Sequence, residues 1–191
     1  MRTVAEIFRS YAVFNAEGKH VNGTDKMSNH NYGDVYESLF PDLKGTLRTR
    51  SGVILMMEVG IADGSSLLAW REVFPNALCV GMDIHHSDRA HGERIEFQLG
   101  DQRSKDDCER VAGGRLFDLI VEDATHEMDS TLLTLYWLWP FVKPGGLYVV
   151  EEWSNIDRNR ITSLFPQAEI IDTQGPFGGV ESLVVFRKPL I

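Results

Sequence analysis

The stretch from Val53 to Trp70 constrains the fold more than any other part of the chain. It reads VILMMEVGIADGSSLLAW, an apolar run that continues into a glycine-bearing turn and the start of a helix. Such a run is typical of a parallel strand covered on both faces. The glycines allow a tight turn and the close approach of a ligand, and we expect Ser65 or Ser66 to cap the helix. Because ligands bind at the carboxyl ends of strands in open α/β sheets, this motif predicts a nucleotide-type pocket near residue 60.

The spacing of the glycines indicates which nucleotide the pocket takes. A dinucleotide-binding turn reads G-x-G-x-x-G, whereas Glu58, Gly60 and Gly64 form the pattern E-x-G-x-x-x-G. A carboxylate facing the pocket repels a pyrophosphate and suits an ammonium or sulfonium group. The motif resembles the first motif of class I S-adenosylmethionine-dependent methyltransferases, and this resemblance implies that these residues and Ser66 bind the cofactor. A strand–turn–helix with an ordinary loop glutamate is the structural alternative.

Two further acidic residues follow predicted strands. Asp83 ends the apolar run from Ala77, and Asp101 follows the run that begins at Glu96. An aspartate at the end of the second strand is placed to bind a ribose diol through charge-assisted hydrogen bonds. Asp101 resembles the residue beside the adenine in the same family. The alternatives are a turn or cap role for Asp83 and ordinary Gly-Asp turn chemistry for Asp101.

Composition indicates one enzyme domain. The 191 residues are enough for a sizeable core, and the formal charge of −9 argues against nucleic acid as a partner. The sequence has no apolar run of about 18 residues, so we expect no membrane span or membrane partner. With only Cys79 and Cys108, a disulfide framework is not expected, and a reducing cytoplasm is the default location.

The order of predicted elements indicates an α/β fold. An amphipathic helix at the amino terminus and a polar stretch precede the first strand, and strands then alternate with helices up to about residue 164, which favours βαβ units. Residues 168–173 and 182–187 are strand-like, with no room for a helix between them, so we expect an antiparallel hairpin. We predict a Rossmann-like class I methyltransferase fold with a mostly parallel seven-stranded sheet. We expect a single domain, in which residues 1–50 form a helical cap and substrate region and residues 51–191 form the Rossmann-like core.

Catalytic chemistry is expected after the fourth and fifth strands. One strand ends at Glu122 and Asp123, with His126 close behind, and the other ends at Glu151 and Glu152. Carboxylates that converge on one sheet edge repel one another and usually hold a cation, for which oxygen ligands of this kind suit Mg²⁺. A histidine beside them can act as a general base. The alternative is that these side chains serve as helix caps and surface groups.

Several motifs together resemble a narrower group, the metal-dependent sugar O-methyltransferases of macrolide and related antibiotic pathways. The resemblance covers residues 23 to about 153 in order and with close spacing. Its motifs are Gly23-Thr24-Asp25-Lys26 with His30, Tyr32, Tyr36 and Glu37; Glu58 to Pro75; Gly100-Asp101-Gln102; Glu122-Asp123-Ala124-Thr125-His126; and Lys143-Pro144-Gly145-Gly146 through Glu151-Glu152.

This resemblance implies a set of site residues. It assigns Asp123, Glu151 and Glu152 as ligands of Mg²⁺ or Mn²⁺ and His126 as the base. Glu122 is expected among the cofactor-binding residues. Glu152 stands where the group usually has aspartate, which lengthens one ligand arm by a methylene. Glu122 and Ala124-Thr125 replace Asp and Gly-Ser of the group's motif, so the loop geometry is expected to differ.

The sequence therefore predicts an S-adenosylmethionine- and divalent-metal-dependent O-methyltransferase. Its acceptor is expected to be a hydroxyl of a small glycosylated or polyhydroxylated natural product, recognised by residues 1–50, 155–160 and 174–179 or by a neighbouring subunit of a homo-oligomer. One alternative is a methyltransferase for another acceptor, such as a catechol or carboxylate. A second alternative is a protein that keeps the fold and cofactor in a non-methylating role.

Overall fold

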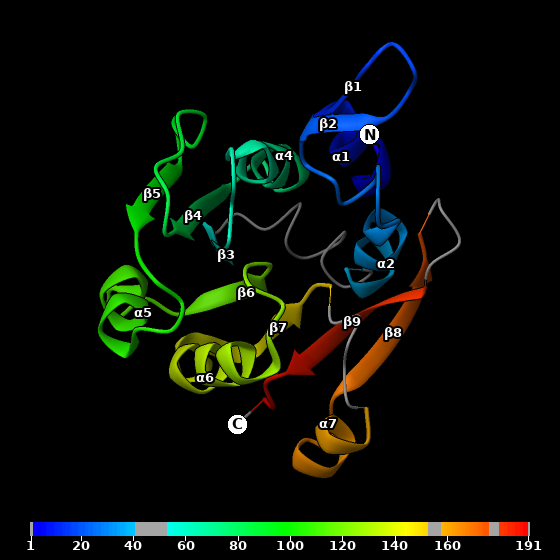
Figure 1. Ribbon diagram of the computed structural model, residues 1–191. Coiled ribbons are helices and arrows are strands. Elements are labelled where there is room, and N and C mark those ends of the chain that lie inside the picture. Colours follow the sequence, from blue (N-terminus) through cyan, green and yellow to red (C-terminus); the bar gives the residue numbers. More distant parts are fainter. Residues whose placement is uncertain (1, 41–52, 153–157, 176–179, 191) are drawn as a thin grey trace.

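A seven-stranded sheet forms the centre of the molecule (Figure 1). The computed structural model describes residues 2–40, 53–152, 158–175 and 180–190. The sheet has the strand order β5-β4-β3-β6-β7-β9-β8. Its strands are β3 (Ile54–Val59), β4 (Ala77–Asp83), β5 (Ile95–Leu99), β6 (Phe117–Glu122), β7 (Val142–Val150), β8 (Glu169–Gln174) and β9 (Val180–Arg187).

Strands β3 to β7 pair in parallel, and β9 is antiparallel to both β7 and β8. The predicted parallel core with a carboxyl-terminal antiparallel hairpin is confirmed. The parallel pairing brings the carboxyl ends of β3, β4, β6 and β7 to one edge of the sheet, where the acidic residues of the sequence motifs lie.

Helices cover both faces of the sheet (Figure 1). One apolar layer packs α1 (Val4–Ser10), α2 (Tyr32–Leu39) and α4 (Ser65–Val73) against one face, and a second layer packs α5 (Lys105–Ala112), α6 (Met128–Leu138) and α7 (Arg158–Leu164) against the other. Successive strand residues alternate between these layers, so that Met56 lies in the first and Met57 in the second. The short 3₁₀ helix η1 (Trp139–Phe141) links α6 to β7.

The amino-terminal segment packs on the first layer. Helix α1 has a capping box between Thr3 and Glu6 and buries Val4, Ile7 and Phe8, which confirms the predicted amphipathic helix. A two-stranded antiparallel sheet of β1 (Ala12–Phe14) and β2 (His20–Gly23) follows and was not predicted. Its strands are short, and none of their residues is buried. The sequence therefore shows no alternation of apolar and polar residues there that would have predicted them.

The turn after β3 corrects one expectation. Neither Ser65 nor Ser66 caps α4: the N-cap is Gly64, in a left-handed conformation with φ of 84° and without a side-chain bond. Ser65 is already the first helical residue, and its backbone amide donates to Asp63 Oδ1 at 2.9 Å. The expected capping role of the serines is therefore wrong, and the aspartate one residue before the glycine satisfies the free amide instead.

Among the helices in the described ranges, none is long and apolar enough to cross a bilayer. Cys79 and Cys108 are both buried, and neither forms a disulfide bond. Within the segments expected to recognise substrate, residues 41–50, 155–157 and 176–179 lie outside the described residues.

Candidate active site

Two neighbouring cavities open at the carboxyl edge of the sheet. The larger, of about 420 Å³, lies around the ends of β3, β4 and β6, and Asp83 and Asp101 are in its lining. The smaller, of about 260 Å³, lies between the same turn and residues 23–25, with His126 and Glu152 in its lining. Both are lined by Gly60, Ala62, Asp123 and Ala124. These shared residues make the two cavities parts of one site.

Gly60 is required where the two cavities meet. Its φ is 83°, and a Cβ atom on it would lie 2.2 Å from the carbonyl oxygen of Asp123. The turn after β3 therefore touches the end of β6 through backbone alone, since any side chain would push the two apart. This contact holds the floor of both cavities together.

Asp83 organises the wall of the larger cavity. Its Oδ2 accepts hydrogen bonds from the backbone amides of Ile61 at 2.9 Å and Ala62 at 3.0 Å, and its Oδ1 accepts one from His85 at 2.8 Å. Asp101, on the same cavity, is held by the guanidinium of Arg103 at 2.9 Å, and this hydrogen bond lowers the pKa of the Asp101 carboxyl. Both carboxylates thus lie in the pocket wall with fixed orientation.

Three of the predicted cofactor residues, Glu58, Gly64 and Glu122, are not in the linings of the two cavities. Glu58 is fully buried and accepts hydrogen bonds from Ser66 Oγ at 2.6 Å and Trp70 Nε1 at 3.3 Å. Glu122 is also buried, and burial raises the pKa of its carboxyl to about 7. Glu122 has the strand parity of Ile120 and therefore faces the layer of α6. Ser66 and Gly60 do line the smaller cavity, and Gly64 starts the adjacent helix.

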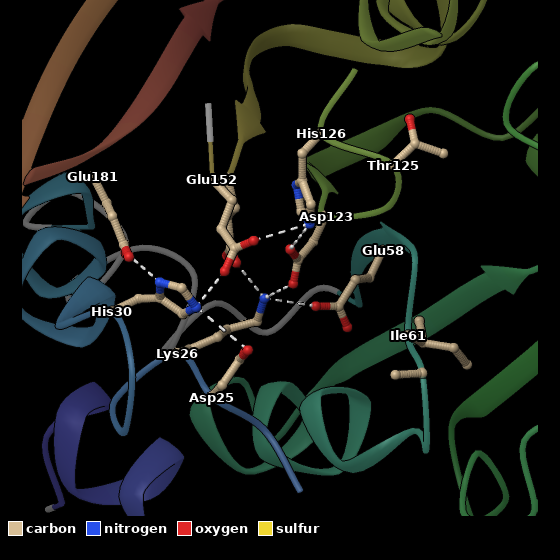
Figure 2. Close-up of polar contacts among 12 residues, drawn as sticks. Asp25, Lys26, His30, Glu58, Ile61, Asp123, Thr125, His126, Glu152 and Glu181 are labelled. Atoms are coloured by element: carbon tan, nitrogen blue, oxygen red, sulfur yellow. Dashed lines mark hydrogen bonds and ion pairs between the residues drawn. The ribbon is translucent and has the colours of Figure 1, made fainter. Parts of the chain in front are cut away.

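Lys26 lies behind the site and joins three carboxylates. Its ammonium lies 3.1 Å from Glu58 Oε1, 2.8 Å from Asp123 Oδ2 and 2.5 Å from Glu151 Oε2 (Figure 2). Burial alone would lower the pKa of Lys26, but the charges of Asp123, Glu151 and Glu58 raise it well above its usual value. The other oxygen of Glu151 accepts a hydrogen bond from Tyr36 Oη. Lys26 therefore stays charged in the interior.

His30 forms a second polar centre beside the first. Its Nδ1 donates to Glu181, and its Nε2 faces Glu152 Oε1 and, at 3.3 Å, Asp25 Oδ2 (Figure 2). Burial would lower the pKa of this imidazole, but hydrogen bonds to Asp25, Glu152 and Glu181 raise it to about 11. The ring of Tyr32 stacks on it, with centroids 5.0 Å apart.

His126 and Glu152 face each other across the smaller cavity. His126 Nε2 lies 3.0 Å from Glu152 Oε2 and 4.0 Å from Asp123 Oδ1. Both residues have left-handed backbones, with φ of 57° for His126 and 52° for Glu152. Such conformations are costly for residues other than glycine and concentrate at functional sites. Two strained residues that meet in one cavity mark it as the candidate catalytic site.

The charges of this region fit a cation. Two cationic groups, Lys26 and His30, are surrounded by more carboxylates than they can neutralise, namely Asp25, Glu58, Asp123, Glu151, Glu152 and Glu181. Of the three predicted metal ligands, Asp123 and Glu152 line the smaller cavity, whereas Glu151 is buried behind it against Lys26 and Tyr36. The oxygen donors of Asp123 and Glu152 suit a divalent cation, whereas the two oxygens of Glu151 accept from Lys26 and Tyr36.

Sequence reasoning left the roles of Asp25, Lys26, His30 and Tyr32 open. Asp25, Lys26 and His30 belong to the G-T-D-K…H-x-Y motif, but neither their spacing nor their residue types show that they reach the ends of β6 and β7. Glu181 stands in β9 and carried no signal in the sequence. The parity of β6 could have shown that Glu122 and Asp123 face opposite sides of the sheet.

The fold is similar to that of a methyltransferase of known structure. At TM-score 0.73 and 20% identity, the chain matches the MycE methyltransferase of the mycinamycin biosynthetic pathway, solved in complex with Mg, SAH and mycinamycin VI; the match covers 98% of this chain and 55% of the other. The chain has the class I methyltransferase fold. No protein-family model matches it.

Two curated relatives are similar in sequence. Demethylmacrocin O-methyltransferase of Streptomyces fradiae is 31% identical over 112 residues, which is 54% of this chain and 28% of the relative. The 8-demethyl-8-alpha-L-rhamnosyl tetracenomycin-C 2'-O-methyltransferase of Streptomyces olivaceus is 28% identical over 139 residues, which is 69% of this chain and 35% of the relative. The resemblance to antibiotic sugar O-methyltransferases is confirmed, and the matches span about a third of these relatives' length.

Proposed function

We propose that this methyltransferase-fold chain is an S-adenosylmethionine- and divalent-metal-dependent O-methyltransferase. The observation that carries the proposal is the pair of connected cavities, one lined by Asp83 and Asp101 and the other by Asp123, His126 and Glu152. A cofactor bound along the first would present its methyl group to an acceptor in the second.

The residues of the larger cavity suit the cofactor. Asp83 has carboxylate oxygens in the wall where a ribose diol would lie, and Asp101 lies further along the same wall. Ser66 and Gly60 line the smaller cavity at the turn, where the methionine end of the cofactor would lie. Glu58 supports this turn from behind through Ser66. S-adenosylmethionine supplies the methyl group as an electrophilic sulfonium.

The residues of the smaller cavity suit a cation and a base. Asp123 and Glu152, with Glu151 behind them, would hold the divalent ion. Such an ion, when bound, supplies positive charge that lowers the pKa of a coordinating hydroxyl. His126 Nε2 lies 3.0 Å from Glu152 Oε2, so it is the ring nitrogen placed to accept the proton of a hydroxyl bound beside these carboxylates. The Glu152 carboxylate then stabilises the resulting imidazolium.

The acceptor class is inferred from the relatives. The tetracenomycin relative is named for a substrate that carries a rhamnosyl group, so we propose a hydroxyl of a glycosylated or polyhydroxylated small molecule as the acceptor. Two vicinal oxygens on a sugar would fit one cation together with the carboxylates.

The experiment is a product assay with a panel of glycosylated polyketides, free catechols and carboxylic acids. Each is incubated with S-adenosylmethionine and Mg²⁺ or Mn²⁺, with and without a chelator, and products are identified by mass spectrometry. We expect one added methyl group on a glycosylated acceptor, and loss of that product with chelator while cofactor binding persists. A methylated catechol alone would change the acceptor class. Full turnover in excess chelator would refute the metal requirement, and binding of NAD in preference to S-adenosylmethionine would refute the whole proposal.

A further inference from the structure

Asp25, His30 and Glu152 form a compact set of donor atoms beside the candidate catalytic cavity. One ligand atom from each lies within 4.8 Å of the other two. The three come from two distant parts of the chain: Asp25 and His30 from the segment between β2 and α2, and Glu152 from the segment that follows β7. Figure 2 shows the imidazole of His30 between the carboxylates. From this arrangement we propose that Asp25, His30 and Glu152 bind a second divalent cation.

The environment of His30 is that of a metal-ligating histidine. Such residues usually donate the ring N–H that faces away from the metal to a carboxylate, which fixes the tautomer and the ring orientation. Here Nδ1 donates to Glu181, and Nε2 is directed at Asp25 and Glu152. The stacked ring of Tyr32 holds the plane of the imidazole.

An unpartnered buried hydroxyl on the same cavity is a second, independent observation. Thr24 Oγ1 is buried and has no hydrogen-bond partner, and the residue is only 5% exposed. Thr24 lines the smaller cavity together with Asp25 and Glu152. Buried hydroxyls are normally satisfied by protein or water. A hydrated cation held by Asp25 and Glu152 at this cavity would supply the missing partner.

The donor set selects the class of ion. One imidazole nitrogen and two carboxylates suit first-row transition metals such as Mn²⁺, whereas Mg²⁺ prefers oxygen ligands alone. Glu152 connects this site to the proposed catalytic one, because its Oε1 faces His30 and its Oε2 faces His126. The inference rests on the proposed function only through this shared carboxylate. An ion here would fasten the amino-terminal segment to the end of β7.

The test uses the full chain, freed of metal and titrated with Mn²⁺ alone. Electron paramagnetic resonance counts the bound ions, and its pulsed form detects nitrogen coupling to them. We expect wild type to bind two ions, one with nitrogen coupling. His30→Gln should lose that coupled ion, Asp25→Asn should weaken it, and Glu181→Gln should weaken it by about 10–100-fold. Asp123→Asn should lose the other ion. His86→Gln, at an exposed histidine away from the site, is the matched control.

Several outcomes would overturn the proposal. Nitrogen coupling that persists in His30→Gln and disappears in His126→Gln would place the ion at the catalytic cavity instead. A single ion in wild type that is lost with Asp123→Asn alone would remove the second site. Far-UV circular dichroism checks that each variant is folded, and Asp25→Asn, at a part-exposed residue, provides a second route if His30→Gln does not fold. Methyl transfer is not the readout, so failure of the proposed function is scored separately.

Discussion

Lys26 and Glu151 are joined in the interior, with the ammonium nitrogen 2.5 Å from Glu151 Oε2 and both side chains almost fully buried. Lys26 follows β2, and Glu151 directly follows β7. The same ammonium reaches Glu58 at the end of β3 and Asp123 after β6. One cation therefore ties the amino-terminal segment to the three strand ends that form the site.

The first prediction concerns this ammonium. Lys26→Met leaves Glu58, Asp123 and Glu151 without their shared cation. Removing one partner of a buried ion pair usually costs about 3–5 kcal/mol, because the remaining charges stay buried and uncompensated. Urea denaturation should show a loss of this size in the free energy of unfolding.

Lys19→Met is the matched control for Lys26→Met. The side chain of Lys19 is 74% exposed and makes one weak ion pair, so its loss should change stability by at most about 0.5 kcal/mol. If the two variants unfold at the same urea concentration, the three carboxylates do not depend on Lys26.

The second prediction concerns cofactor binding. Asp83→Asn keeps the shape of the side chain but removes the charge that would bind a ribose diol. Loss of a charged hydrogen bond costs about 1.5–3 kcal/mol, so calorimetry with S-adenosylhomocysteine should show affinity lowered by about 10–100-fold. Asp88→Asn, whose side chain is 98% exposed, should bind like wild type. Equal affinity in both variants would remove Asp83 from the cofactor site.

The architecture was accessible to sequence reasoning because it depends on local patterns. Buried strands read as apolar runs, and the short connection before β9 allowed only a hairpin. The acidic residues after β6 and β7 were also predictable, since parallel strands end at one sheet edge. The place of Lys26 was not, because a contact between residues about a hundred positions apart leaves no periodic trace. Glu122 was assigned to the cofactor together with the other residues at this sheet edge, but adjacent strand residues face opposite sides, and Glu122 faces away from Asp123.

The third prediction concerns His126. Replacement by Ala removes the base beside the proposed cation and should cut turnover by roughly 10²–10⁴, the usual contribution of general base catalysis. Affinity for the cofactor should stay nearly unchanged, since His126 lines only the smaller cavity. His86→Ala is the control, at an exposed histidine. Turnover equal to wild type at neutral pH would show that another group takes the proton.

The fourth prediction concerns Glu122 and pH. Burial, together with the smaller effect of the Asp123 charge, raises the pKa of this carboxyl from its ordinary value of 4.5 to about 7. Below the unfolded-state pKa the carboxyl is neutral in both states and costs nothing. Between about pH 4.5 and pH 7 the unfolded state releases the proton while the folded state keeps it, so folding stability falls as pH rises. Above the folded-state pKa the loss is complete.

Glu122→Gln isolates this effect, because the amide is neutral at every pH and nearly isosteric. In the presence of chelator, the free energies of unfolding of wild type and variant should agree near pH 4. By about pH 8 the variant should be more stable, by up to about 3 kcal/mol. Glu17→Gln, at a side chain that is 74% exposed, should follow the wild-type pH profile. A variant whose difference from wild type is the same at both pH values would show that Glu122 is already ionised when the chain is folded.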